Sequence, residues 1–182
     1  MSSVKINKID VHDIRVPTSD TLLGSDPFHK KPNYSCVYTT IHLSNGIKGN
    51  SVCFTAGAGN DWIVYGVKDI SKLLQEYEID NFIENPGSTY KLINDHHQLR
   101  WLADGVNRMA LGCIMNSMWD AWAKIEEKSL WKLLVDIDPE KIIKSIDWRY
   151  LKDSISKEEA LNILEENSYQ KNSREKQLLK NG

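Results

Sequence analysis

The sequence has little net charge, no long apolar run and no apolar leader. Lys and Arg number 23 against 25 Asp and Glu, a formal net charge of −2, so the chain lacks the positive excess that nucleic-acid binding requires. The longest apolar stretch, Met109 to Met115, is far shorter than the roughly 20 residues that span a bilayer, and the first residues do not resemble a signal peptide. We therefore expect no nucleic-acid or membrane partner, and a soluble protein of the cytoplasm or, alternatively, the mitochondrion.

Cysteine, glycine and proline are also scarce. The chain has 3 cysteines, 10 glycines and 5 prolines among 182 residues, and 41% of its residues are hydrophobic, which is a globular rather than a disordered or collagen-like composition. Cys36, Cys53 and Cys113 are far apart and lack C-x-x-C spacing, so we expect buried thiols rather than a zinc or redox motif. The length fits one domain, or one domain with a tail.

The first third of the chain alternates apolar and polar residues with a period of two, which predicts strands. The alternation slips between residues 4–6 and 9–11, which predicts a bulge. A second run, 37–43, is separated by Asn45-Gly46 from a third run, 47–54. Asn-Gly between two such runs predicts a hairpin with a type I′ turn, in which both central residues adopt positive φ.

A long segment without periodicity, residues 15–35, connects the first two strands. Loops of this length inside a compact domain are either functional lids or disordered. We therefore treat this loop as a candidate lid.

Apolar residues at spacings of three and four predict helices from Gly59 onward. The first apolar stripe comprises Ile63, Val67, Ile70, Leu74 and Tyr77, with Asn60 or Asp61 placed to cap the helix. Further helices are expected from near Pro86 through Ile93, from Val106 to about Glu126 as the central buried helix, over 130–134 after Ser129, after Asp138-Pro139, after a capping box at Ser156, and weakly or as a frayed tail over 167–182. The pattern predicts an α+β domain, a three-stranded antiparallel β-meander followed by a helical bundle.

Isolated motifs in the sequence are incomplete. Gly57 and Gly59 open a glycine-rich turn, but Trp62 stands where a dinucleotide motif needs a third glycine and no P-loop lysine follows. His96 and His97 are adjacent, so they diverge on a helix and cannot jointly hold a metal. With no nucleophile beside a base and no metal triad, we expect no catalytic residue and no metal ligand within this chain.

Asp120 lies between Trp119 and Trp122 on the long helix. A carboxylate on an apolar helix needs a partner, and the candidates that stay open are Arg100, Arg108 and Arg149. The tryptophans, with Trp131, are expected to be core or interface residues.

Several segments together resemble the N-terminal capping domain of the enolase superfamily, in its mandelate racemase/muconate lactonizing enzyme branch. They are Trp119 to Lys124, Leu130 to Pro139, Asp147 to Tyr150, Arg15 to Ser19, Gly24 to Asp26, Asn33 to Ser35 and Gln98 to Trp101. The segment from Gly24 to Tyr34 is similar to the L-fuconate dehydratase subgroup. The resemblance covers residues 4 to 180.

The resemblance implies a function for the cap. Enzymes of the L-fuconate dehydratase type are Mg²⁺-dependent hydro-lyases of sugar acid catabolism whose metal ligands and acid and base groups lie in a barrel domain. It implies that residues 1–150 are the cap, with residues 15–35 as its lid loop, and that residues 151–182 are a helical linker or tail leading to a barrel. The chain, lacking those barrel residues, is expected to be inactive alone.

The resemblance also implies a substrate contact. Gly24, Ser25, Asp26 and Tyr34 match the lid positions that meet the sugar acid, and Thr55 with the Gly57 turn forms the second lip of the lid. A barrel domain or a homo-oligomer is the expected partner. The alternative is a free-standing module with the cap fold that binds a protein through the Trp119, Trp122 and Trp131 surface.

Overall fold

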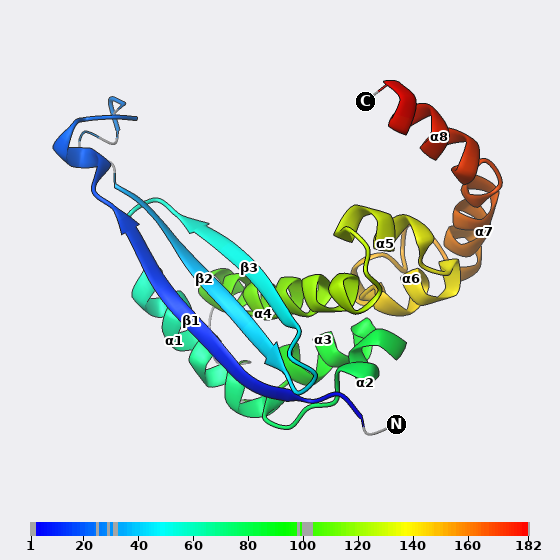
Figure 1. Ribbon diagram of the computed structural model, residues 1–182, viewed down its shortest axis with the longest axis horizontal. Coiled ribbons are helices and arrows are strands. Elements are labelled where there is room, and N and C mark those ends of the chain that lie inside the picture. Colours follow the sequence, from blue (N-terminus) through cyan, green and yellow to red (C-terminus); the bar gives the residue numbers. More distant parts are fainter. Residues whose placement is uncertain are drawn as a thin grey trace.

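The structure, a computed structural model, describes residues 3–24, 26–28, 30, 33–97, 99 and 104–181. Its elements (Figure 1) are β1 (Ile6–Val16), η1 (Thr18–Asp20), β2 (Tyr34–Leu43), β3 (Lys48–Thr55), α1 (Asn60–Ser71), η2 (Lys72–Leu74), α2 (Ile79–Glu84), α3 (Pro86–Asn94), α4 (Asp104–Ile125), α5 (Leu130–Asp136), α6 (Pro139–Ser145), η4 (Trp148–Tyr150), α7 (Lys157–Ser168) and α8 (Lys171–Asn181). The sheet is antiparallel in the order β1-β2-β3. The predicted α+β fold, a meander followed by helices, is confirmed.

The strand register confirms the predicted bulge and corrects the predicted turn. The pairing of β1 with β2 shifts between Ile6 and Lys8, as the slip in the pattern indicated. In the hairpin, the Gly46 N–H donates to the Leu43 carbonyl at 3.0 Å, and only Gly46, with φ of 88°, adopts the left-handed conformation. Asn45 does not, so the type I′ turn is wrong. A three-residue loop that ends in a glycine bulge needs one left-handed residue rather than two.

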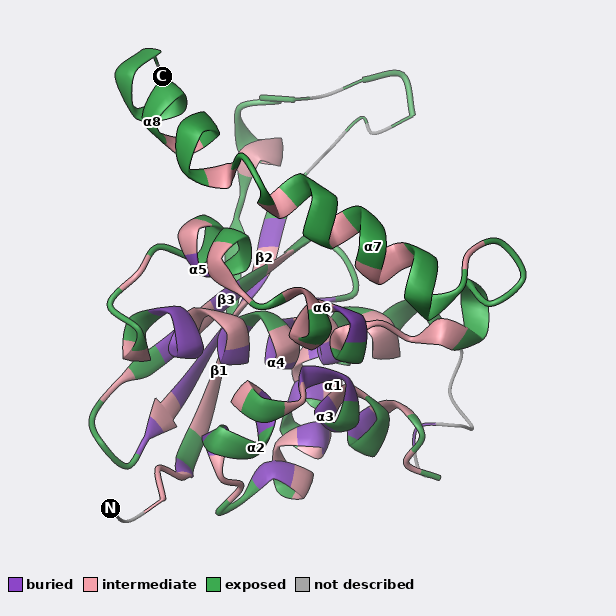
Figure 2. Ribbon diagram, turned by 90° about the vertical axis from the view of Figure 1, so that its right-hand side faces the viewer, coloured by how far each residue is buried: buried purple, intermediate pink, exposed green. Residues whose placement is uncertain are grey.

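Helices α1 and α4 cover one face of the sheet and form the core with it (Figures 1 and 2). The apolar stripe of α1 is buried as predicted, and α4 is the central helix. Burying one large aliphatic side chain stabilises a fold by about 1.5–3 kcal/mol. Those at most 2% exposed in this core include Val37, Ile41, Ile63, Val67, Ile70, Leu74, Ile114 and Met118.

Small residues bring α4 close to β3. A Cβ atom added at Gly49 would lie 2.0 Å from the Ser117 carbonyl oxygen. Beside it, the Ser51 hydroxyl donates to the Cys113 carbonyl at 2.7 Å. The helix therefore rests directly on the backbone of the strand, which leaves no room for a side chain at position 49.

The predicted caps of the later helices are formed. The Asp138 carboxylate accepts from the Glu140 N–H at 2.8 Å. Ser156 and Glu159 form a complete capping box, with each side chain bonded to the other residue's backbone N–H. These local signals lie within a few residues, so the sequence alone determines them.

Three local predictions are wrong or incomplete. The cap expected from Asn60 or Asp61 is not formed, because left-handed Gly59 occupies the N-cap position and Asn60 is already helical. Ser129 precedes α5 but its side chain caps nothing in the described structure. The short helix α2 lies in a stretch for which the sequence pattern gave no signal.

The last two helices extend away from the sheet (Figure 1). Neither α7 nor α8 contains a buried residue, although Glu175 on α8 pairs with Lys132 on α5 at 2.7 Å. The weakly apolar tail is thus a helix held by charge rather than by a core. In the part of the chain that the structure describes, every helix is too short or too polar to traverse a bilayer.

Candidate functional site

Four chain segments meet at one end of the sheet. The end of β1, the start of β2, the end of β3 and the start of α1 converge there, and the lid loop (residues 17–33) projects from it (Figure 1). The loop is shorter than the expected span of 15–35, because Arg15 and Val16 pair with Ser35 and Tyr34 in the sheet. A second loop at this end, the glycine turn (residues 56–59), joins β3 to α1.

Two of the four predicted substrate residues lie against each other. Gly24 has φ of 78°, and a Cβ added there would lie 2.8 Å from the Tyr34 hydroxyl oxygen. The Tyr34 ring in turn contacts Phe54 on β3, with ring centroids 5.8 Å apart. Only glycine gives this left-handed conformation and this approach without strain.

The other two predicted substrate residues are Asp26 and Ser25, and the structure describes only Asp26. Asp26 accepts a hydrogen bond from the Phe28 N–H at 2.8 Å, which folds the loop tightly after it. Phe28 is 93% exposed. Ser25 lies outside the described residues.

The lid loop and the glycine turn touch. The Ser19 N–H donates to the Asn33 side-chain oxygen at 3.1 Å. A Cβ at Gly57 would lie 2.6 Å from the Asn33 carbonyl oxygen, and the Gly57 N–H donates to the Ser35 hydroxyl at 2.8 Å. The two loops that the resemblance assigns to one lid are therefore packed together at their bases.

A buried polar network lies beneath both loops. The Ser35 and Thr55 hydroxyls are 2.6 Å apart, and Thr55 donates to the Asn60 side-chain oxygen. The Asn60 amide donates to Asp13 at 2.6 Å and to the Cys36 carbonyl at 3.2 Å. Asn60 is only 1% exposed, so this one side chain joins β1, β2, β3 and α1.

Sequence reasoning missed this role of Asn60. Its position at a helix start favoured a local cap, whereas its partners lie up to 47 residues away. A polar residue directly after a glycine-rich turn gives no signal that distinguishes the two possibilities. The tertiary approach of β1 decides between them.

Ion pairs at this end of the sheet connect β1 to α1. Arg15 binds the Asp13 carboxylate through two nitrogens and Asp61 at 2.8 Å. The Arg15 guanidinium, with the Asn60 amide, holds the pKa of the Asp13 carboxyl below its usual value. Asp13 is therefore ionised at neutral pH and serves as an acceptor, not as an acid.

The described residues do not fit a magnesium ion. Among them, no group of three His, Cys, Asp or Glu side chains is placed to hold a metal. The expectation that His96 and His97 diverge on a helix is wrong, because they follow the end of α3 and their ring centroids lie 4.7 Å apart. They still belong to no group of three potential metal ligands in the described structure. No step of a metal-dependent reaction can therefore be built from these residues.

The partner of Asp120 is a lysine, so the expected arginine is wrong. The Asp120 carboxylate lies 2.6 Å from the Lys124 ammonium and accepts from the Asn50 N–H at 2.7 Å. Lys124 is one helical turn away and also donates to the Lys48 carbonyl. The three arginines considered lie elsewhere: Arg108 pairs with Asp104, Arg149 pairs with Asp147 and Asp95, and Arg100 is outside the described residues.

The tryptophans do not form a common surface. Trp122 is 3% exposed and stacks on Trp119, with centroids 5.1 Å apart, while Phe82 packs edge-on against both. Trp131 on α5 is 53% exposed. Trp119 and Trp122 therefore belong to the core, and the alternative of a protein-binding module loses the surface on which it depended.

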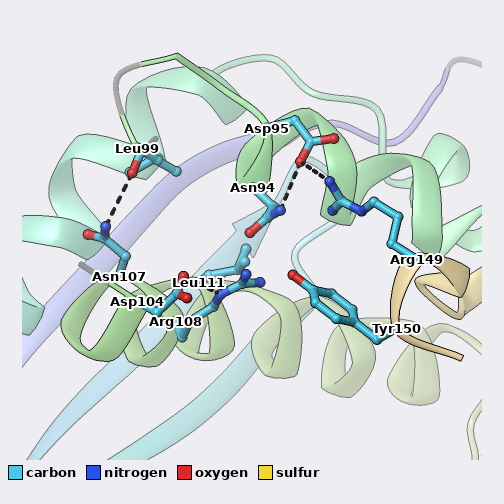
Figure 3. Close-up of a pocket in the computed structure, with 9 residues that line it drawn as sticks. All are labelled: Asn94, Asp95, Leu99, Asp104, Asn107, Arg108, Leu111, Arg149 and Tyr150. Atoms are coloured by element: carbon cyan, nitrogen blue, oxygen red, sulfur yellow. Dashed lines mark hydrogen bonds and ion pairs between the residues drawn. The ribbon is translucent and has the colours of Figure 1, made fainter. Parts of the chain in front are cut away.

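A polar cavity of about 510 Å³ lies between α3, α4 and η4 (Figure 3). The Arg108 and Arg149 side chains reach into it beside Tyr150. Both guanidinium groups are already paired, with Asp104 and with Asp95 and Asp147 respectively. The cavity therefore offers no uncompensated charge to a ligand, and the lid end of the sheet is the better candidate site.

No family model matches the chain, but individual proteins do. Human mitochondrial enolase superfamily member 1 is 36% identical over 182 residues, which is 98% of this chain and 41% of the relative. The L-galactonate dehydratase of Hypocrea jecorina is 33% identical over 183 residues, 100% of this chain and 41% of the relative. The chain thus spans about two fifths of the length of these relatives.

Solved structures agree. The crystal structure of the human protein superposes with a TM-score of 0.92 at 36% identity and covers 99% of this chain and 42% of its own. L-Talarate dehydratase from Polaromonas, at 17% identity, gives a TM-score of 0.60 over 75% of this chain and 36% of its own, which supports the fold alone. The chain therefore has the fold of the enolase N-terminal capping domain, and in sequence it is similar to about two fifths of an enolase superfamily member.

Proposed function

We propose that this chain is the capping, substrate-specificity domain of a sugar-acid hydro-lyase of the L-fuconate dehydratase type. The observation that carries the proposal is the joined lid. The lid loop and the glycine turn lie side by side at one end of the sheet, held by the Asn60 network. A preorganised lid of this kind excludes water from a reacting centre and contacts the distal part of a substrate.

We propose a division of the chain into a cap, residues 1–150, and a helical linker, residues 151–182. In support, the most buried apolar side chains all lie before residue 150, and α7 and α8 contain no buried residue. The linker would lead to the barrel domain that carries Mg²⁺ and the acid and base groups.

We propose that Gly24, Ser25, Asp26 and Tyr34 contact the sugar acid. Hydroxyl and carboxylate groups can bond the hydroxyls of such a substrate, and Gly24 allows close backbone approach. Tyr34 is 43% exposed, so part of this residue is open to solvent. The apolar residues on the same face of the sheet, Ile14, Val16, Val52 and Phe54, are 40–59% exposed, which suits docking against a barrel domain.

A turnover and binding experiment tests the proposal. The purified chain, with Mg²⁺, is incubated with L-fuconate and with L-galactonate, which differ only at C6. We expect no dehydration of either acid, since among the described residues no three His, Cys, Asp or Glu side chains are placed to hold the Mg²⁺ ion that the reaction would need. Calorimetry should detect weak, saturable binding of one acid.

Variants of the lid provide the matched controls. Asp26→Asn and Tyr34→Phe should each weaken that binding about tenfold or more, which corresponds to about 1.4 kcal/mol. Glu158→Gln, on the exposed first turn of α7, should leave it unchanged. Turnover by the chain alone, or binding that the lid variants do not weaken, would overturn the proposal.

A further inference from the structure

A second cavity, of about 450 Å³, lies well away from the lid end of the sheet. It is bounded by the first turn of α3, by α6 and the segment that follows it, and by the start of α7, at the side of the molecule opposite the lid loop (Figure 1). Its volume is within the range of about 300–1,000 Å³ that is typical of small-molecule sites.

The walls of this cavity are preformed. A Cβ at Gly87 would lie 2.1 Å from the Lys144 carbonyl oxygen, so α3 and α6 are in direct backbone contact. The Trp148 indole N–H donates to the Ile143 carbonyl at 2.9 Å, which fixes the ring at the cavity wall. Ile146 and Leu161 complete an apolar surface beside the indole.

The charge around this surface is mainly positive. Lys91, Lys144 and Lys157 line the cavity with a single acid, Glu140. No ion pair within 4.0 Å joins any of the three lysines to another residue that the structure describes, although the charge of Lys91 contributes to lowering the pKa of the Asp147 carboxyl. Lys157 lies 5.9 Å from the centroid of the Trp148 ring. Seven other lysines do form such pairs: Lys5, Lys8, Lys72, Lys124, Lys128, Lys132 and Lys141.

The first turn of α3 adds to the positive electrostatic potential in this cavity. Asn85, Gly87 and Ser88 line the same cavity, and the N-terminus of a helix carries the positive end of its dipole. An anion placed between the lysines therefore gains from both sources. The arginine-lined cavity differs in this respect, because its two guanidinium groups are already neutralised.

We propose that this cavity binds a small organic carboxylate with an apolar body. The carboxylate would lie among the lysine ammonium groups, and the body would pack against Trp148, Ile146 and Leu161. Both parts are required, because the surface combines an excess of positive charge with apolar side chains. The site is separate from the lid and does not depend on the function proposed for it.

The test uses the full chain labelled with ¹⁵N and the probe 3-phenylpropionate. Its neutral analogue 3-phenylpropionamide and inorganic phosphate are titrated in parallel, and the reporter is the indole N–H signal of Trp148, assigned with Trp148→Phe. We expect saturable shifts of this signal with the carboxylate, and at least tenfold weaker binding of both the amide and phosphate.

Two double variants test whether the cavity lysines bind the carboxylate. The double variant Lys144→Gln/Lys157→Gln should weaken the binding of 3-phenylpropionate at least fivefold. The control double variant Lys176→Gln/Lys180→Gln, on the exposed face of α8, should leave this binding unchanged. Equal binding of the amide or phosphate, an equal effect of the two double variants, shifts confined to the lid end, or no saturable shift would each overturn the proposal.

Discussion

Asn60 shows how one side chain organises the candidate site. Its amide and carbonyl groups bond to partners on three strands, and it is fully buried. Removing the side chain takes one buried hydrogen bond each from the Thr55 hydroxyl, the Asp13 carboxylate and the Cys36 carbonyl. A buried polar atom without its partner costs about 1–3 kcal/mol.

Asn60→Ala should therefore lower the free energy of unfolding by about 1–3 kcal/mol, as measured by urea denaturation. Amide hydrogen exchange should also become faster in the glycine turn, which the network supports. Asn7→Ala, at an exposed position of β1, is the control and should change neither quantity. Equal stability of the Asn60 and Asn7 variants would contradict the structural role.

The cysteines differ in reactivity for a physical reason. Burial raises the pKa of the Cys113 thiol to about 12 and also raises the pKa of Cys53. Since the thiolate is the reactive form, iodoacetamide at about pH 8 should leave Cys113 unmodified in the folded chain. Mass spectrometry should detect its modification only after denaturation. Modification of Cys113 at the rate of Cys36 in the native chain would contradict its burial.

At the scale of elements, the close contact of α4 with β3 depends on Gly49. Its missing side chain lets the strand lie against the Ser117 and Ala121 backbone. Overpacking at such a contact typically costs about 1–3 kcal/mol. The packing of α4 on β3 therefore requires a residue without a side chain at this position.

A pair of glycine substitutions tests this contact. Gly49→Ala should lower the unfolding free energy by about 1–3 kcal/mol or more. Gly112→Ala, within α4 with open space around it, should raise it by up to about 1 kcal/mol, because alanine favours a helix. Thermal and urea denaturation measure both. The two changes in unfolding free energy should have opposite signs. Destabilisation by both substitutions would show that α4 has little room for an added methyl group at Gly112 as well as at Gly49.

At the scale of the whole molecule, paired carboxylates determine the response to acid. Lysine or arginine neighbours lower the pKa values of Asp10, Asp13, Asp136 and Asp147 below 3.8. In the unfolded chain these groups return to ordinary values, so their contribution to stability is present above about pH 4 and is lost as the pH falls through the folded values.

Thermal denaturation between about pH 7 and pH 2.5 should therefore show a steep loss of stability at the acid end. Asp13→Asn, which cannot titrate at this position, should lose less stability over the same interval than the parent chain. A parallel decline of the two proteins would mean that Asp13 contributes nothing to the acid sensitivity.

Much of the fold could be predicted from local sequence signals. The period-two runs, the glycine after Asn45, the apolar stripe of α1 and the Ser156 capping box each involve residues within about one or two turns of one another. The physical reason is that hydrophobic periodicity and caps act over short distances along the chain. The resemblance to capping domains likewise depends on short segments that are recognised in the sequence without the tertiary structure.

The tertiary structure alone decided the rest. Asp120 takes Lys124 and the Asn50 backbone as partners, and Asn50 is 70 residues away along the chain. The Asn60 side chain bonds to Asp13 instead of capping its own helix, and the backbones at Gly87 and Lys144 contact each other at a cavity wall. The sequence specifies which groups can bond, but only packing decides which of them come together, because a buried polar group accepts whichever partner the fold brings within reach.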